Sequence, residues 1–309
     1  MNTSLFFRRF GCRVLGGCIL ILPLSAGKAQ EKYKEPDFPV PPEAVAKEGV
    51  TAGKIERFQW KSTGVYPGTI RNVSIYVPAQ YKPDGSAALM VFQDGHSYVN
   101  PKGEFKTTII FDNLIAAGQM PVTVGVFIDP GVFADSLPEE TNWQVLNKMK
   151  SNRSVEYDTP NGDYAKFLEK EILPEVTKRY SFSAEPDKHA TCGISSGGIC
   201  AFTAAWERPD LFRKVLSHVG SFTNIRGGYH YPFLLRKTPP KPLRVFLQDG
   251  AHDLNNIHGN WVLANQMMAD SLAFAKYDSK FVTDERGAHS GKHGGSILPD
   301  SLRWLWRNP

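Results

Sequence analysis

The hydrophobic residues of this chain recur with two spacings that alternate along the sequence. Residues 55–60 and 69–77 alternate roughly between apolar and polar positions around a turn-rich segment, which predicts a long antiparallel hairpin. Continuous apolar runs follow at 88–92 and 121–128, as expected of strands buried on both faces. An amphipathic helix is predicted between these runs, over residues 109–118.

The second half of the chain continues this alternation of strands and helices. Strands are predicted at 214–218, 243–247 and 281–284, and helices at 164–180, 261–277 and 298–306. The stretch from 132 to 161 shows no clear period and is expected to be irregular. Strands that alternate with helices form a mostly parallel sheet covered on both faces. We therefore predict an α/β fold with functional residues at the carboxyl ends of its strands.

The N-terminus has a different pattern. Arginines precede an apolar run at 14–24, and small residues follow to Ala29, which is the order of a secretory signal peptide over residues 1–29. The apolar run is too short to span a membrane. We expect cleavage near Ala29 and export to the periplasm or beyond, with no stable membrane insertion. A lipoprotein cleavage site at Cys18 is the alternative.

A Pro-, Glu- and Lys-rich segment follows the predicted signal. Residues 30–53 are expected to form an extended, poorly ordered lead-in to one domain over 54–309. Four of the cations behind the formal charge of +5 lie in the predicted signal, so the mature chain is nearly neutral. No basic stripe is present, which argues against a nucleic-acid partner. Cys192 and Cys200 flank a turn and diverge from it, so free buried thiols are predicted.

One short motif suggests chemistry. Residues 193–197 read Gly-Ile-Ser-Ser-Gly, directly after a strand-like segment and before a small-residue helical segment. A nucleophile elbow needs this G-x-S-x-G context, because the glycines let the chain turn sharply while the serine stands clear of the sheet. Ser195 is therefore predicted to be a nucleophile. The alternative is a Gly/Ser-rich loop that matches by chance.

A serine nucleophile needs a histidine base and an acid that orients it, in the chain order Ser, acid, His. The loop after strand 243–247 offers Asp249 and Asp253, and its position favours Asp253 as the acid. The loop after strand 281–284 offers His289 and His293. His289 comes first after the strand and is taken as the base, with His293 as a neighbour.

The same elbow predicts where the oxyanion would be bound. One donor should be the backbone N–H of Ser196, and the other should come from the loop at Gly95 and His96. A metal site is the rival interpretation of the histidines. His289 and His293 have i, i+4 spacing, but the glycines around them argue against a helix. We expect no metal and no other cofactor.

Three segments together resemble a known family. They are residues 193–198, residues 250–253 and residues 287–289, accompanied by the Asp94-Gly95 loop. They resemble the esterase family that contains enterochelin esterases, feruloyl and acetyl-xylan esterases of carbohydrate esterase family one, S-formylglutathione hydrolases and mycolyltransferases. The resemblance covers about Phe58 to Trp306.

This resemblance implies an α/β-hydrolase fold without a separate cap domain and without a metal. By this resemblance, Ser195 is expected to be the nucleophile, Asp253 the acid and His289 the base. The chain departs from the family where members often place an acid and a tryptophan after the histidine, because Ser290 and His293 stand there. The substrate side of the base is therefore left open.

Several residues are candidates for the substrate pocket. Arg153 and Glu156 could line it, or could instead form a structural ion pair. Aromatic residues could form a wall for an aryl acid or a sugar, or could belong to the core. The residues considered in this way are Asp94, Tyr98, Arg153, Glu156, Tyr157, Phe222, Tyr229, Trp261 and His293.

The sequence thus predicts a secreted serine carboxylesterase that acts on a small-molecule or polysaccharide-linked ester. Feruloyl or acetyl esters on plant polysaccharide are the leading substrates. Hydrolysis of an enterochelin-like catecholate siderophore, or acyl transfer, is the alternative within enzymes. A degenerate hydrolase fold that only binds carbohydrate or a partner is the alternative outside them.

Overall fold

A computed structural model of the chain describes residues 33–308. The predicted signal peptide and the lipoprotein alternative at Cys18 lie outside the described residues. In the described part, residues from Glu35 onward form one unit. No helix in that part is long and apolar enough to cross a bilayer.

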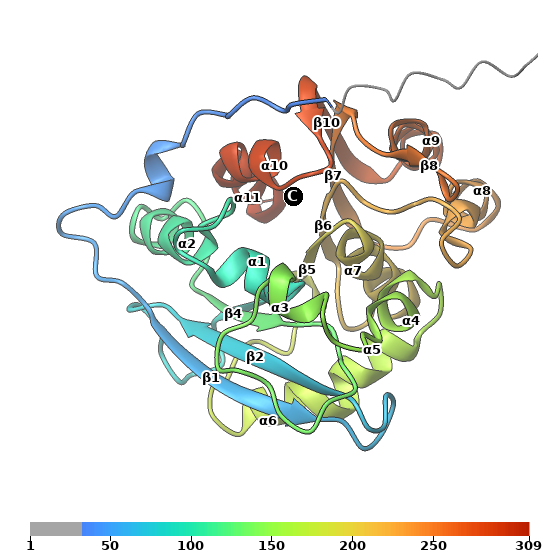
Figure 1. The fold of residues 1–309 in the computed structure, drawn as a ribbon. Helices are drawn as coiled ribbons and strands as arrows, with labels where there is room; N and C mark the ends of the chain where they lie inside the picture. The colour runs from blue at the N-terminus through green and yellow to red at the C-terminus, as the bar shows by residue number, and fades with distance from the viewer. Residues whose placement is uncertain (1–32, 309) are drawn as a thin grey trace, which may run out of the picture. The chain divides into compact units, whose positions relative to one another are not determined.

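The described residues form an eight-stranded sheet with the order β1-β2-β4-β3-β5-β6-β7-β10 (Figure 1). β1 pairs with β2, and β2 with β4, in antiparallel fashion, and the remaining neighbours are parallel. The strands are β1 (Lys54–Lys61), β2 (Ile70–Val77), β3 (Ala88–Gln93), β4 (Thr123–Ile128), β5 (His189–Ile194), β6 (Lys214–His218), β7 (Arg244–His252) and β10 (Asp278–Ala288). A small second sheet pairs β8 (Asn255–Asn256) with β9 (Gly259–Asn260).

Helices cover both faces of the large sheet (Figure 1). One face packs against α1 (Gly95–Val99), α2 (Thr107–Ala116) and α11 (Leu298–Trp306). The other packs against α4 (Arg153–Asp158), α5 (Asp163–Phe167), α6 (Leu173–Thr177), α7 (Ser196–Glu207), α8 (Tyr231–Lys237) and α9 (Trp261–Phe274). The shorter helices are α3 (Trp143–Leu146), α10 (Lys292–Ser296), and the single turns at Pro42–Ala44, Pro186–Lys188 and Gly228–His230.

The pleat of the central strands divides the core in two. In β3, Leu89 and Val91 belong to the core under α4 to α9, whereas Met90 and Phe92 belong to the core under α1, α2 and α11. Successive side chains of a strand point to opposite faces, so a strand buried on both sides needs an unbroken apolar run. This explains why the run at 88–92 has no polar alternation. The predicted mostly parallel α/β-hydrolase sheet with helices on both faces is confirmed.

The structure corrects three local expectations. The helix predicted over 164–180 is divided, because a π-helical turn at Leu168–Ile172 separates α5 from α6, and α6 carries Pro174 in its first turn. The supposedly irregular stretch before residue 161 contains α3 and α4. The lead-in is extended from residue 35 to 41, but it makes specific side-chain contacts instead of being poorly ordered. Cys192 and Cys200 are buried free thiols, as predicted.

Candidate active site

Ser195 occupies a sharp turn between β5 and α7. Its backbone angles are φ 59° and ψ −120°, which is a strained conformation for a residue with a side chain. The turn brings Gly193 and Gly197 so close that a Cβ on Gly193 would lie 2.1 Å from the Gly197 carbonyl oxygen. The two glycines are therefore a steric requirement of the turn. The side chain of Ser195 is left at the carboxyl end of the sheet, beside the start of α7.

Two neighbouring strands bring a histidine and an aspartate to this serine. His289 follows the last residue of β10, and its Nε2 lies 2.8 Å from Ser195 Oγ. Its Nδ1 lies 2.5 Å from Oδ1 of Asp253, which follows β7. The same Oδ1 accepts the N–H of Leu254 at 2.5 Å, which fixes the carboxylate toward the ring. The hydrogen bond to Asp253 keeps the ring proton on Nδ1, so Nε2 can accept the proton of Ser195.

The charges around His289 favour its neutral form. Burial, and to a smaller extent the Arg153 guanidinium, lowers the pKa of His289 to about 4. A neutral imidazole at pH 7 is the form that can accept a proton. The edge of the Trp261 ring packs on the imidazole, with ring centroids 5.8 Å apart, and limits its movement.

Of the two candidate aspartates, only Asp253 contacts the histidine ring. Asp249 is almost fully buried within β7, near Asp253. Burial, together with the nearby Asp253 carboxylate, raises the pKa of Asp249 to about 9. Asp249 therefore favours its neutral form at pH 7.

The loop after β3 is the second part of the predicted oxyanion site. Ser196 and Gly95 are the first residues of α7 and α1, where backbone N–H groups have no intrahelical acceptor. His96 does not fit that role. Its N–H donates to Asp129 Oδ1 at 2.9 Å, and its ring Nδ1 lies 2.9 Å from the same oxygen. The prediction of His96 as an oxyanion donor is therefore wrong, because Asp129 already takes its N–H.

Arg153 and Asp94 form a pair beside the elbow. Nε and Nη2 of Arg153 donate to the two carboxylate oxygens of Asp94 at 2.8 and 2.7 Å. Arg153 Nη2 is also 3.4 Å from the carbonyl oxygen of Ile194, the residue before Ser195. The guanidinium lies 5.0 Å from the ring centre of Trp143, whose side chain is partly exposed. The Nε–Nη2 edge of Arg153 is thus held by buried Asp94 and lies beside the residue that precedes the serine.

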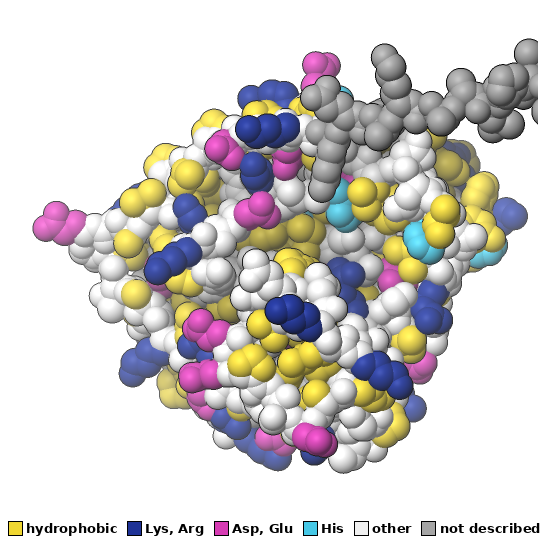
Figure 2. Space-filling model, in the orientation of Figure 1, with side chains coloured by type: hydrophobic (Ala, Val, Ile, Leu, Met, Phe, Trp, Pro, Cys, Tyr) yellow, Lys and Arg dark blue, Asp and Glu magenta, His cyan; other side chains and the backbone are white. Residues whose placement is uncertain are grey.

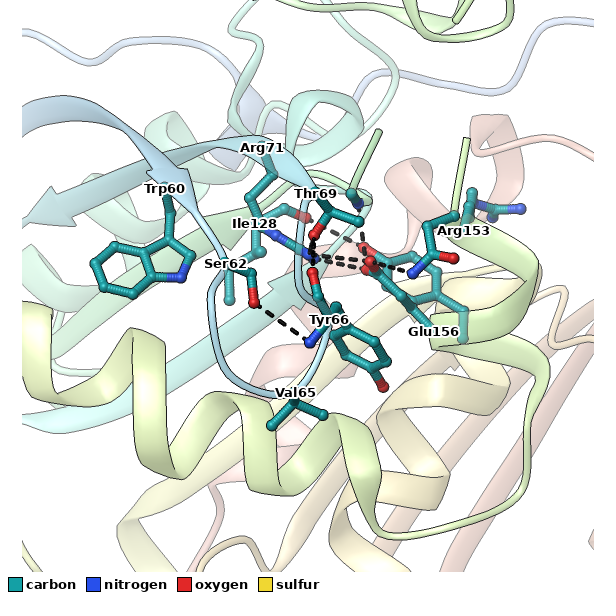
Figure 3. Close-up of polar contacts among 12 residues, drawn as sticks. Trp60, Ser62, Val65, Tyr66, Thr69, Arg71, Ile128, Arg153 and Glu156 are labelled. Carbon is teal, nitrogen blue, oxygen red and sulfur yellow. Dashed lines mark hydrogen bonds and ion pairs between the residues drawn. The ribbon is translucent and has the colours of Figure 1, made fainter. Parts of the chain in front are cut away.

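Glu156 does not lie at the site, contrary to one of the two expectations for it. Figure 3 shows its carboxylate facing Arg71, which donates to it at 2.6 and 2.9 Å. Both side chains are fully buried. Arg71 also donates to Thr69, and the Gly131 N–H donates to Glu156. Glu156 therefore belongs to a structural ion pair, but its partner is Arg71 instead of the expected Arg153.

The aromatic residues considered for a wall divide between the core, the surface and the site. Tyr98 is fully buried, with its hydroxyl 2.8 Å from His218 Nδ1. Phe222 is buried against Phe202 with ring centroids 5.7 Å apart. The core interpretation therefore holds for Tyr98 and Phe222, whose positions on α1 and after β6 point into the two cores. Tyr229 is exposed and stacks on His230, whereas Trp261 packs against His289 at the site.

His293 lies apart from the serine. It is buried in α10, where Gln248 Nε2 lies 3.1 Å from its Nδ1 and Phe38 stacks on its ring. His293 lies in the short helix α10 together with Gly294 and Gly295, so the expectation that these glycines prevent a helix was wrong there. His289 lies before the start of α10, so the two histidines do not share a helix. No group of three or more metal-ligating side chains occurs among the residues from 33 to 308.

Sequence reasoning placed the segment 220–226 beside the pocket but did not single out Ser221 as a functional residue. Ser221 follows β6, and its Oγ lies 3.2 Å from Ser195 Oγ. The available signal was its place directly after Gly220, at the carboxyl end of a parallel strand. On the face drawn in Figure 2, the described cationic and anionic side chains are intermixed with hydrophobic ones, without a broad surface of one sign.

Comparisons with known proteins agree with this geometry. A family model described as "Putative esterase" matches residues 65–293. An iron(III) enterobactin esterase of Escherichia coli is 30% identical over 209 residues, which cover 60% of this chain and 50% of that protein. The chain thus spans about half the length of this curated relative.

Two groups of solved structures share the fold. The enterobactin esterase of Shigella flexneri, determined in the presence of enterobactin, matches with a TM-score of 0.62 and 22% identity over 82% of this chain and 58% of that one. A ferulic acid esterase from the anaerobic fungus Anaeromyces mucronatus matches with a TM-score of 0.62 and 17% identity over 86% of this chain and 94% of that one.

Proposed function

The chain belongs to this esterase family, and from that premise we propose that it is a serine carboxylesterase that works through Ser195, His289 and Asp253. One observation carries the proposal: His289 hydrogen-bonds Ser195 Oγ with one nitrogen and Asp253 with the other. A serine hydroxyl is a poor nucleophile until a positioned base takes its proton. The arrangement supplies that base and the carboxylate that orients it.

The proposed reaction has two stages. Ser195 Oγ attacks the ester carbonyl while His289 Nε2 takes the hydroxyl proton, and Asp253 stabilises the imidazolium that forms. His289 then gives the proton to the leaving alcohol, which leaves an acyl group on Ser195. A water molecule next gives a proton to His289 and attacks the acyl group, and His289 returns that proton to Ser195 Oγ as the acid product leaves. In both stages the carbonyl oxygen becomes negative, and we assign its stabilisation to the N–H groups of Ser196 and Gly95.

For the substrate, we propose an ester with an aromatic acyl group. The partly exposed Trp143 ring and the Arg153 guanidinium beside it offer an aromatic surface and a positive charge near the elbow, which suit an aryl ring that carries catechol oxygens. The enterobactin esterase relative supports a catecholate siderophore ester. Feruloyl or acetyl esters on plant polysaccharide, the leading expectation from the sequence, remain the second candidate because feruloyl esterases share the fold. Export through the N-terminal signal is part of the same proposal.

Three esters separate these substrates: methyl ferulate, p-nitrophenyl acetate and a linear catecholate-serine ester, each with the protein starting at residue 30. We expect hydrolysis of the catecholate-serine ester, and a loss of at least about 10³-fold in the Ser195→Ala variant. Ferulate or acetate turnover without catecholate turnover would assign the protein to polysaccharide esters.

Covalent labelling tests the nucleophile without a known substrate. An organophosphonate should modify Ser195 in the wild-type chain and leave Ser195→Ala unmodified. A folded wild-type protein that resists labelling and hydrolyses none of the three esters would overturn the esterase proposal. It would favour a hydrolase fold that only binds its ligand.

A further inference from the structure

A hydroxyl other than the histidine's hydrogen-bond partner lies beside the nucleophile. Ser221 Oγ lies 3.2 Å from Ser195 Oγ, and the Ser221 side chain is almost fully buried. The backbone links the same two residues, because the Ser221 N–H donates to the Ser195 carbonyl oxygen at 3.0 Å. Ser221 is therefore held against the elbow by its main chain and its side chain together.

The loop that carries Ser221 is strained. Val219, at its start, has φ 42°, a conformation that β-branched residues rarely adopt. The Val219 N–H donates to the Gln248 carbonyl oxygen at 2.7 Å, and Asn265 Nδ2 donates to the Gly220 carbonyl oxygen at 2.9 Å. Strain of this kind persists only when the surroundings hold it in place. Here β7 and α9 hold the loop in the one path that brings Ser221 to Ser195.

Trp261 determines the direction of the Ser221 hydroxyl. The indole Nε1–H donates to Ser221 Oγ at 3.1 Å, and an indole N–H can only donate. The Ser221 oxygen is thus an acceptor toward Trp261, and its own proton is available for Ser195 Oγ. Ser195 in turn directs its proton to His289 Nε2, 2.8 Å away. The four groups form one directed chain from Trp261 through Ser221 and Ser195 to His289.

We propose that Ser221 is a catalytic residue that donates a hydrogen bond to the reacting oxygen of Ser195, with Trp261 as its positioning residue. This rests on the proposed esterase function. Oγ gains negative charge as it loses its proton to His289, and again when the acyl-enzyme breaks and Oγ departs as the leaving group. A buried hydrogen-bond donor aimed at that oxygen stabilises its negative charge in both steps. No proton needs to leave Ser221 at either step.

A matched pair of variants tests this role. Ser221→Ala removes the donor, whereas Ser217→Ala removes a buried hydroxyl of β6 for which the described residues offer no hydrogen-bond partner. For Ser221→Ala we expect organophosphonate labelling of Ser195 and ester kcat to fall about 10- to 100-fold, with KM nearly unchanged. Ser217→Ala should keep both near wild type. Ser221→Thr retains a hydroxyl and should recover part of the rate.

Trp261→Phe keeps the ring against His289 but removes the N–H, so it should lower the labelling rate by less than Ser221→Ala does. Thermal unfolding of each variant separates reactivity from folding. Equal labelling rates in wild type and folded Ser221→Ala would overturn the proposal and leave Ser221 a structural residue. Failure of the esterase proposal looks different, because the wild-type chain itself would then not be labelled.

Discussion

At the residue scale, two neighbouring aspartates take opposite protonation states. Asp253 is 2.5 Å from His289 Nδ1 and serves as an acceptor, while burial beside Asp253 raises the pKa of Asp249. Two buried carboxylates so close together cannot both be charged at low cost. The proton goes to Asp249, the more deeply buried of the two.

This difference predicts unequal effects of the same substitution. Asp253→Asn replaces the acceptor that holds the ring proton on Nδ1, so kcat should fall by about 10³- to 10⁴-fold. Asp249→Asn replaces a neutral acid by a neutral amide of similar shape that can still donate, so kcat should stay within about tenfold. Steady-state kinetics on any ester that the wild type hydrolyses measures both. Equal losses would mean that Asp249 carries the charge.

The same pair predicts how stability depends on pH. The pKa of Asp249 is raised from 3.8 to about 9 in the folded chain, so between these values the folded state binds a proton that the unfolded state lacks. The contribution of Asp249 to the free energy of unfolding is fully present below about pH 4 and is lost as the pH rises toward 9. The slope is at most about 1.4 kcal/mol per pH unit.

Asp249→Asn does not titrate, so its unfolding free energy should fall less than that of the wild type between pH 5 and pH 8. Urea unfolding at both values measures the difference. Parallel curves for the two proteins would show that Asp249 is already ionised at pH 5.

At the scale of elements, the elbow depends on contacts between glycines. A Cβ on Gly193 would meet the backbone of Gly197 at 2.1 and 2.2 Å, and backbone atoms cannot move aside as a side-chain tip can. Gly193→Ala should therefore lower the melting temperature by more than 10 °C or abolish soluble expression. Gly162→Ala is the matched control, because its nearest neighbours would lie at 3.8 Å. A folded, active Gly193→Ala protein would contradict this explanation of the motif.

The elements that the sequence predicted well are those whose pattern comes from burial on the sheet. The run at 88–92 matches β3 because a strand buried on both faces has no polar position to obscure its limits. α4 was missed because its buried residues Glu156, Tyr157 and Asp158 are polar or mixed, and their burial depends on a partner from β2. Arg71 and Glu156 are 85 residues apart in the sequence, so their contact leaves no signal in the local sequence around α4.

The site residues likewise divide into those that local sequence patterns could predict and those that depend on distant contacts. Chain order and strand ends favoured Ser195, Asp253 and His289, and the family resemblance supported the same three, but position alone did not decide between Asp253 and Asp249 or between His289 and His293. They could not show that Asp129 takes the His96 N–H or that Ser221 reaches Ser195, because these depend on loop paths. Sequence patterns record which strand a loop follows, but not the direction in which its groups point.

At the scale of the whole molecule, the start of the described unit is attached to the loop that carries the histidine. Glu35 accepts the Ala288 N–H at 2.7 Å and the Ser290 hydroxyl at 2.5 Å, so its carboxylate bridges the residues on either side of His289. Phe38 stacks on His293, which lies three residues after Ser290. The lead-in thus restrains the position of the base, although it adds no strand to the sheet.

Glu35→Ala should therefore weaken activity more than stability. Without the carboxylate, the Ala288 N–H and the Ser290 hydroxyl lose their acceptor, and the imidazole should spend less time within reach of Ser195. We expect kcat to fall about 3- to 10-fold while KM and the melting temperature change little. Asp37→Ala is the matched control, because it removes an exposed ion pair with Lys292 from the same segment, and such pairs contribute little. If both variants lost the same activity, the effect would belong to the segment as a whole, and the bridging role of Glu35 would be refuted.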